Sequence, residues 1–193
     1  YGICSAALLL HAEAPYLINR LDIAVAVAPL IAAMGFVEWR AEHFRAQAVA
    51  LTRRSQTPHV FSRAVWRLIA RETAYCLGVP ALLSLVLFTA LAAVDRLSAA
   101  AVLMTAAHVA LAGAYYSAFL LAGFERFRWL CGSMAVALVV HVGFGAAAGA
   151  SPLFGQTSAP VTDTALYLGS VLTLQGLFLI GLAPLVGQVR HYR

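Results

Sequence analysis

The chain has 193 residues, of which 62% are hydrophobic and 11% are charged, and its mean hydropathy is +0.84. A soluble domain averages about 45–50% apolar and about 25% charged residues, so this composition excludes a soluble globular protein and predicts surfaces that face lipid. The formal net charge of +5 comes from 13 arginines without any lysine, and their positions fit membrane orientation better than nucleic-acid binding.

Five long apolar runs follow one another along the chain and predict transmembrane helices. Each run has enough residues to cross about 30 Å of hydrocarbon at about 1.5 Å per residue. Residues 2–10 are also apolar but are too few for a span, so we expect them to end a truncated helix in a fragment of a longer protein. We therefore predict an all-α, polytopic transmembrane helical bundle, a single domain over residues 1–193, with full spans at about 21–38, 73–94, 97–123, 129–149 and 164–187.

The segment 39–72, between the first two full spans, has helical patterns of its own. Thr57 followed by Pro58 predicts a helix start, with Thr as the N-cap and Pro at the first helical position. An apolar stripe follows, formed by Phe61, Val65, Leu68 and Ile69, and three arginines recur every four residues on another face, namely Arg63, Arg67 and Arg71. We expect an amphipathic helix that lies along the inner membrane surface. The three arginines either anchor this helix and set the topology, or contact anionic headgroups or a phosphate-bearing substrate.

The arginines are distributed unevenly between the two predicted sides of the membrane. If the segment 39–72 is cytoplasmic, eleven of the 13 arginines fall on that side, and Arg20 and Arg96 fall outside. Such a bias is the usual determinant of orientation in membrane proteins. We therefore expect an integral protein of the bacterial cytoplasmic (inner) membrane with a cytoplasmic C-terminus.

Four polar residues fall near the middle of the predicted spans, namely Ser84, His108, His141 and Gln175. A polar side chain at this depth is costly unless it meets a partner or a water-filled cavity. Three interpretations remain open: interhelical hydrogen bonds that hold the bundle together, a cavity for a transported solute, or haem ligation by His108 and His141. In each case we predict that His108, His141 and Gln175 face the interior of the bundle.

Motifs for covalent chemistry are absent from the sequence. It contains no phosphate-binding glycine loop, HExxH, CxxC or nucleophile elbow. Cys4, Cys76 and Cys131 have neither metal-binding nor redox spacing, and we expect them to be free thiols. We thus predict that the protein is not an enzyme, has no catalytic residues and holds no metal or cofactor.

The layout resembles the multidrug/oligosaccharidyl-lipid/polysaccharide flippase superfamily, in particular its polysaccharide and O-antigen flippases. In that family each half has six helices, with a long cytoplasmic amphipathic segment after the second and a short cytoplasmic turn after the fourth. Here the segment Glu38–Glu72, which enters LGVPALLSLVLF with Pro80 early in the helix, is similar to the long connection. The sequence SAFLLAGFERFRWL is similar to the fourth helix and its turn, with matching positions at Gly123, Arg126 and Arg128.

The resemblance implies a membrane transporter half that moves a polysaccharide or a lipid-linked oligosaccharide by alternating access around a midplane cavity. Its partners would be membrane lipids, a lipid-linked or polymeric sugar substrate, and a missing N-terminal half or partner subunit, without nucleic acid. One alternative is a haem-binding membrane anchor of an electron-transfer complex, in which His108 and His141 face each other across a porphyrin. The other is a non-catalytic structural membrane subunit.

Overall fold

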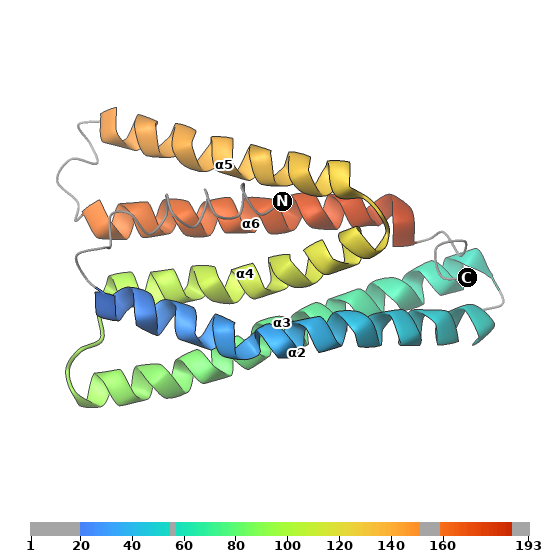
Figure 1. Cartoon of the computed structure of the whole chain (residues 1–193), viewed down its shortest axis with the longest axis horizontal. Helices are drawn as coiled ribbons and strands as arrows, with labels where there is room; N and C mark the ends of the chain where they lie inside the picture. The colour runs from blue at the N-terminus through green and yellow to red at the C-terminus, as the bar shows by residue number, and fades with distance from the viewer. Residues whose placement is uncertain (1–19, 55–56, 151–158, 187–193) are drawn as a thin grey trace.

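The computed structural model describes residues 20–54, 57–150 and 159–186, and this part of the chain forms five α-helices without a strand (Figure 1). Each helix contains a stretch that is long and apolar enough to cross a membrane, which confirms the predicted all-α transmembrane bundle. The helix that we predict to end at residues 2–10 and the C-terminal arginines, Arg190 and Arg193, lie outside the described residues. The helices are α2 (Arg20–Arg54), α3 (Pro58–Ala93), α4 (Ala99–Gly123), α5 (Phe127–Ala150) and α6 (Ala159–Val186).

Capping residues and tight turns set the helix ends. The hydroxyl of Thr57 accepts a hydrogen bond from the Val60 amide at 3.4 Å, and Pro58 begins α3, as the sequence predicted. Ser98 caps α4 in the same way through the Ala101 amide at 3.0 Å. Asp95 and Glu125 each take a positive φ, of 53° and 60°, in the short turns that follow α3 and α4. These turns reverse the chain within a few residues and make successive helices antiparallel (Figure 1).

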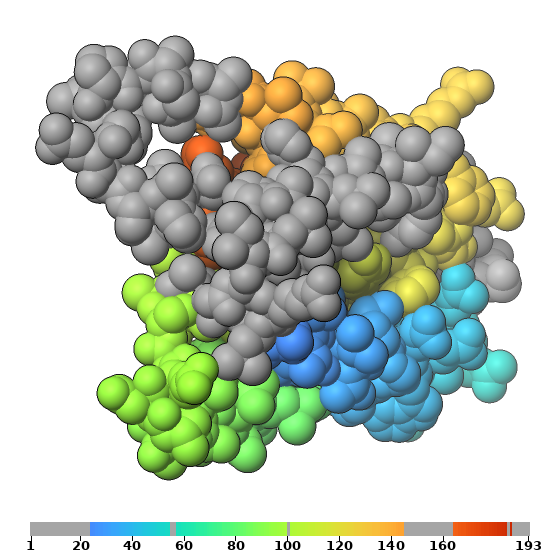
Figure 2. Space-filling model, turned by 60° about the vertical axis from the view of Figure 1, so that its left-hand side comes forward, coloured from blue at the N-terminus to red at the C-terminus, as the bar shows by residue number. Residues whose placement is uncertain are grey.

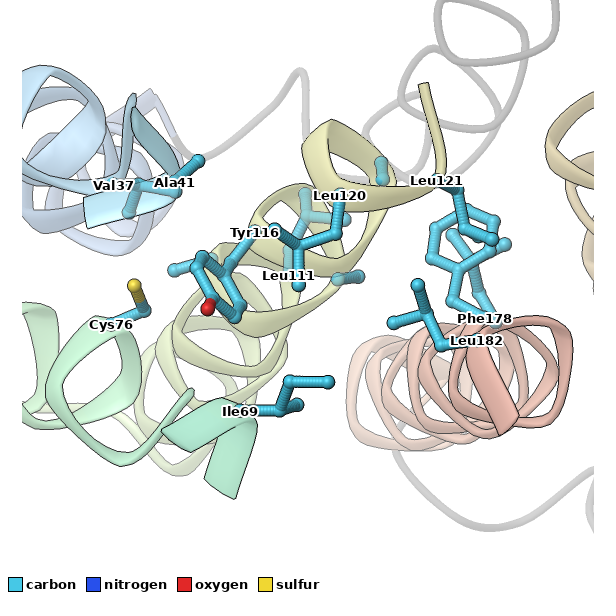
Figure 3. Close-up of a cluster of buried hydrophobic side chains, with 14 of the residues drawn as sticks. Val37, Ala41, Ile69, Cys76, Leu111, Tyr116, Leu120, Leu121, Phe178 and Leu182 are labelled. Carbon is cyan, nitrogen blue, oxygen red and sulfur yellow. The ribbon is translucent and has the colours of Figure 1, made fainter. Parts of the chain in front are cut away.

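Helix α4 lies at the centre of the bundle, with α2 and α6 on either side of it, while α3 packs on α2 and α5 packs on α6 (Figure 1). Small buried residues on α4, among them Ala107, Ala112 and Ala118, let the neighbouring helices approach closely. Figure 3 shows Tyr116 and Leu111 of α4 pointing into the space bordered by α2, α3 and α6. The hydrophobic core is therefore organised around α4.

The outer faces of the bundle are apolar. In Figure 2 the green end of α3 and the orange α5 lie at opposite edges of the molecule. Both helices expose large apolar side chains, including Leu82, Leu85 and Val86 on α3 and Val139 and Phe144 on α5. Exposed apolar surface of this extent is expected of helices that face lipid or another membrane-embedded chain.

The segment 39–72 differs from its predicted arrangement. It is helical and amphipathic, but it forms the end of α2 and the start of α3, packed together as an antiparallel hairpin that extends past α4 and α6 (Figure 1). At about 1.5 Å per residue, the 36 residues of α3 span about 54 Å, well beyond the hydrocarbon thickness of about 30 Å. The expected surface helix is thus the beginning of a continuous α3. Its apolar stripe is buried inside the protein, with Phe61 and Val65 at most 1% exposed, so α2 covers the surface that we had assigned to lipid.

Candidate functional site

The two midplane histidines meet around one tyrosine. His108 on α4 is 1% exposed, His141 on α5 is 6% exposed, and Tyr167 on α6 is 1% exposed. The Tyr167 ring centroid lies 5.6 Å from that of His108 and 6.2 Å from that of His141, the second pair meeting edge to face. Three different helices therefore contribute to a single buried cluster, which confirms that both histidines face the interior.

Each imidazole in this cluster has a defined hydrogen bond. The His108 Nδ1 lies 2.9 Å from the carbonyl oxygen of Met104, and because a carbonyl only accepts, this nitrogen donates. The His141 Nδ1 lies 3.2 Å from the Ser170 hydroxyl, which itself donates to the Leu166 carbonyl at 2.9 Å. That hydroxyl proton is already committed, so His141 donates to Ser170. Residues 167 and 170 share one face of α6 because they are three positions apart.

A second interhelical polar contact lies five residues further along α6, at Gln175. The side-chain amide of Gln175 donates to the Ser117 hydroxyl of α4 at 3.1 Å. Gln175 is partly buried, and its amide oxygen also lies beside Gly113 of α4. The prediction that Gln175 faces the interior is therefore confirmed, and its partner is Ser117, which the sequence analysis did not identify.

Ser84 does not join these residues. It is buried on α3, and its hydroxyl donates to the carbonyl of Pro80 at 2.7 Å, a bond within its own helix. We define the polar layer as His108, His141, Tyr167 and Ser170 together with the Ser117–Gln175 pair. Among the four predicted midplane residues, three belong to this layer, and Ser84 lies apart from it.

The polar layer has the character of an internal seal. Its groups are hydrogen-bonding and aromatic side chains, and they join α4, α5 and α6 by direct contacts. A porphyrin bound between the two histidines would have to displace the buried Tyr167 ring, which touches both imidazoles. The residues present therefore do not fit the haem arrangement, and their bonding favours the interpretation in which they hold the helices together.

A charged cluster in the hairpin was missed by the sequence analysis. Glu72 on α3 is fully buried and forms ion pairs with Arg40 of α2 and with the neighbouring Arg71. The Arg40 guanidinium also lies 4.8 Å from the Tyr75 ring centroid and 5.1 Å from that of Trp39. One sequence feature could have revealed the pair, since Glu72 is the only acidic residue between positions 43 and 94. A lone carboxylate in an arginine-rich segment usually has a cationic partner when it is buried.

The predicted headgroup-contact arginines occupy two grooves of the hairpin. Arg67 and Arg71 line a groove of about 340 Å³ between α2 and α3, which Gln47 and Arg54 also line. Arg63 and Arg67 line a second groove of about 400 Å³ together with His59. Arg71 is held in place because its guanidinium donates to the side-chain oxygen of Gln47 and to Glu72. The structure thus adds Arg54 and Gln47, from the other arm of the hairpin, to the predicted arginines.

Two further features bear on function, namely side chains that could bind a metal and similarity to known proteins. Among the side chains that the structure describes, no three His, Cys, Asp or Glu residues come together as a metal site, and Cys76 and Cys131 are free thiols. No protein-family model, curated protein or solved structure matches the chain.

Proposed function

We propose that the chain is one half of a transporter that moves a polysaccharide or a lipid-linked oligosaccharide across the bacterial cytoplasmic membrane. The observation that supports this function is an asymmetry in helix length: α2 and α3 extend past the other helices as a long hairpin, whereas α4 and α5 end at a tight turn (Figure 1). This is the arrangement that the flippase resemblance implies. It is also the arrangement that places most arginines on one side of the membrane.

A contact between the hairpin and the tight turn adds to this argument. The guanidinium of Arg45, on the hairpin arm of α2, lies directly against Gly123 at the end of α4, where no side chain could stand without displacing it. Gly123 is one of the positions that match the family's fourth helix and turn. The hairpin therefore contacts the end of α4 through the exposed side chain of Arg45.

In this proposal the polar layer keeps the half rigid while it moves. Alternating access needs bundles that rock against each other as bodies around a cavity between them. The His141–Ser170 and Gln175–Ser117 bonds hold α4, α5 and α6 together within one body. The transport cavity would then lie between this half and its partner, bordered by an outer face of the bundle, and His108, His141, Gln175 and Ser84 would not line it.

Gene deletion in the organism that encodes the chain tests the transport function. We expect the lipid-linked or polymeric sugar to accumulate on the cytoplasmic side, measured by separating inner-leaflet from exported glycan, and to return to normal when the gene is restored. Normal export in the deletion strain would contradict the proposal. The upstream reading frame offers an independent check, because about six further hydrophobic segments are expected there or in a partner subunit.

The alternative of a non-catalytic structural subunit is favoured by the same bonded polar layer. The deletion strain distinguishes the structural function from the transport function. A structural subunit would be needed for the abundance of a partner complex, measured in isolated membranes, whereas a transporter half would be needed for export while other membrane complexes stay at normal levels.

A further inference from the structure

The tip of the hairpin is a strongly basic surface without compensating acids. From His43 to Arg71 the sequence contains six arginines and no aspartate or glutamate. Because these residues fold into two antiparallel helices, arginines from both arms line one groove between them. Such a concentration of one charge raises the local concentration of anions.

The groove between the two arms has a specific construction. We call it the arginine groove, lined by Gln47, Arg54, Arg67 and Arg71, with apolar walls that include Leu51 and Leu68. Arg71 is fixed by Gln47 and Glu72. In the part of the chain that the structure describes, Arg54 and Arg67 form no ion pair. The arginine groove thus holds two guanidinium groups without a carboxylate partner and a third that is already positioned.

The depth of the arginine groove restricts its ligand. Arg71 lies two residues before the predicted start of a span at residue 73, which places it about 3 Å outside the hydrocarbon. Ala64, at the far end of the groove, lies about 14 Å outside it. The headgroup layer is about 5–8 Å thick on each side, so the groove begins among the headgroups and opens into water. A ligand at the membrane surface can therefore reach it.

Guanidinium groups recognise phosphate oxygens through paired, charge-assisted hydrogen bonds. A cluster of several arginines can form more of these bonds with a diphosphate ligand than with a single carboxylate ligand. We infer that the arginine groove binds a phosphate or diphosphate group, with Arg54 and Arg67 as the principal ligands and Arg71 as a fixed wall. The inference rests on the proposed function in one respect, that the bound group would be the diphosphate of the lipid-linked sugar that is to be transported. Binding itself requires no transport.

Binding of a polyprenyl diphosphate to the full chain in phosphatidylcholine nanodiscs tests this inference, with bound lipid counted by native mass spectrometry. In this assay R54Q/R67Q should weaken binding about 30-fold, because each arginine near an anionic headgroup contributes about a fivefold factor. The matched control is R53Q/R126Q, which also removes two positive charges from exposed positions on the same predicted side but leaves the groove intact. Unchanged melting temperatures of both variants would show that neither loses its fold.

Inorganic pyrophosphate, added as a competitor, distinguishes the two sources of the phosphate group. Displacement of the lipid would identify a soluble phosphate ligand as sufficient, and failure to displace it would identify the membrane-anchored diphosphate. Either result supports the arginine groove if binding depends on Arg54 and Arg67. Equal weakening in R53Q/R126Q, or wild-type binding in R54Q/R67Q, would overturn it. Loss of transport function alone would leave the binding result intact, so the two proposals fail separately.

Discussion

The polar layer and the hairpin differ in what satisfies their polar side chains. In the polar layer, hydrogen-bonding side chains from α4, α5 and α6 contact one another, and all of them except the partly buried Gln175 are buried. In the hairpin, charged side chains dominate, one carboxylate is buried against two arginines, and Arg53, Arg54, Arg63 and Arg67 stay exposed. Hydrocarbon offers no hydrogen bonds, so polar groups within it must satisfy each other. Outside it water solvates the charges, which leaves them available to a ligand.

The largest expected effect concerns the side of the membrane on which the hairpin tip and the turn after α3 lie. With the native cysteines replaced, Arg53→Cys at the hairpin tip should react with an impermeant thiol reagent only from the cytoplasmic side, and Asp95→Cys only from outside. An odd number of spans separates the two positions, so the effect is all or none. Labelling of both from the same side would contradict the predicted orientation.

Loss of the buried carboxylate should cause the largest change in stability. Glu72→Ala leaves the Arg40 guanidinium buried without its partner, and we expect a loss of about 3–5 kcal/mol in the free energy of unfolding. The measurement is equilibrium unfolding in detergent. Glu42→Ala, at an exposed position on the α2 arm of the hairpin, is the matched control and should change stability by less than about 0.5 kcal/mol. Replacing both partners of the buried pair by leucine should restore much of the loss, and a double variant as unstable as Glu72→Ala would argue against the ion pair.

A smaller loss of stability should follow when the space that the Trp129 ring occupies is filled. The indole N–H donates to the Leu177 carbonyl at 2.8 Å, and the ring occupies the space beside Gly181, where an added methyl group would overlap it. Gly181→Ala should therefore cost about 1–3 kcal/mol through overpacking. Gly176→Ala on the same helix has nothing within 4 Å of the new methyl group and should be neutral or slightly stabilising. Thermal unfolding of the two variants compares them, and equal melting temperatures would mean that Trp129 is not held at Gly181.

The smallest effect concerns the hydrogen bonds of the polar layer. Ser117→Ala removes the partner of Gln175 and should cost about 0.6 kcal/mol, up to about 1.7, as interhelical bonds in membranes typically do. Ser84→Ala removes a hydroxyl that bonds only to its own helix, so its effect should be close to zero. A double-mutant cycle between Ser117 and Gln175 measures the coupling directly. Coupling no larger than that between Ser84 and Gln175 would contradict the interhelical bond.

Much of the fold was predictable because a membrane imposes strong constraints on local sequence. A span must be apolar over about 20 residues, so α4, α5 and α6 were recognisable from composition alone. The Thr57–Pro58 start of α3 was predictable for a different reason, since a cap is satisfied by atoms only a few residues away. The burial of His108 and His141 followed from the cost of polar groups in hydrocarbon, although their common neighbour Tyr167 did not.

Local patterns along the chain therefore predict the set of helices, their polar and apolar faces, and the arginine asymmetry. What covers each face depends instead on how the helices pack against one another. The periodicity of Phe61, Val65 and Leu68 shows that one side of a helix avoids water, but lipid and the neighbouring α2 satisfy that requirement equally well. The same holds for Glu72, whose carboxylate needed a cation, while the chain offered several arginines and only the packing of α2 on α3 selected Arg40. Partners that are distant in sequence depend on how helices are placed in space, and local patterns carry no information about that placement.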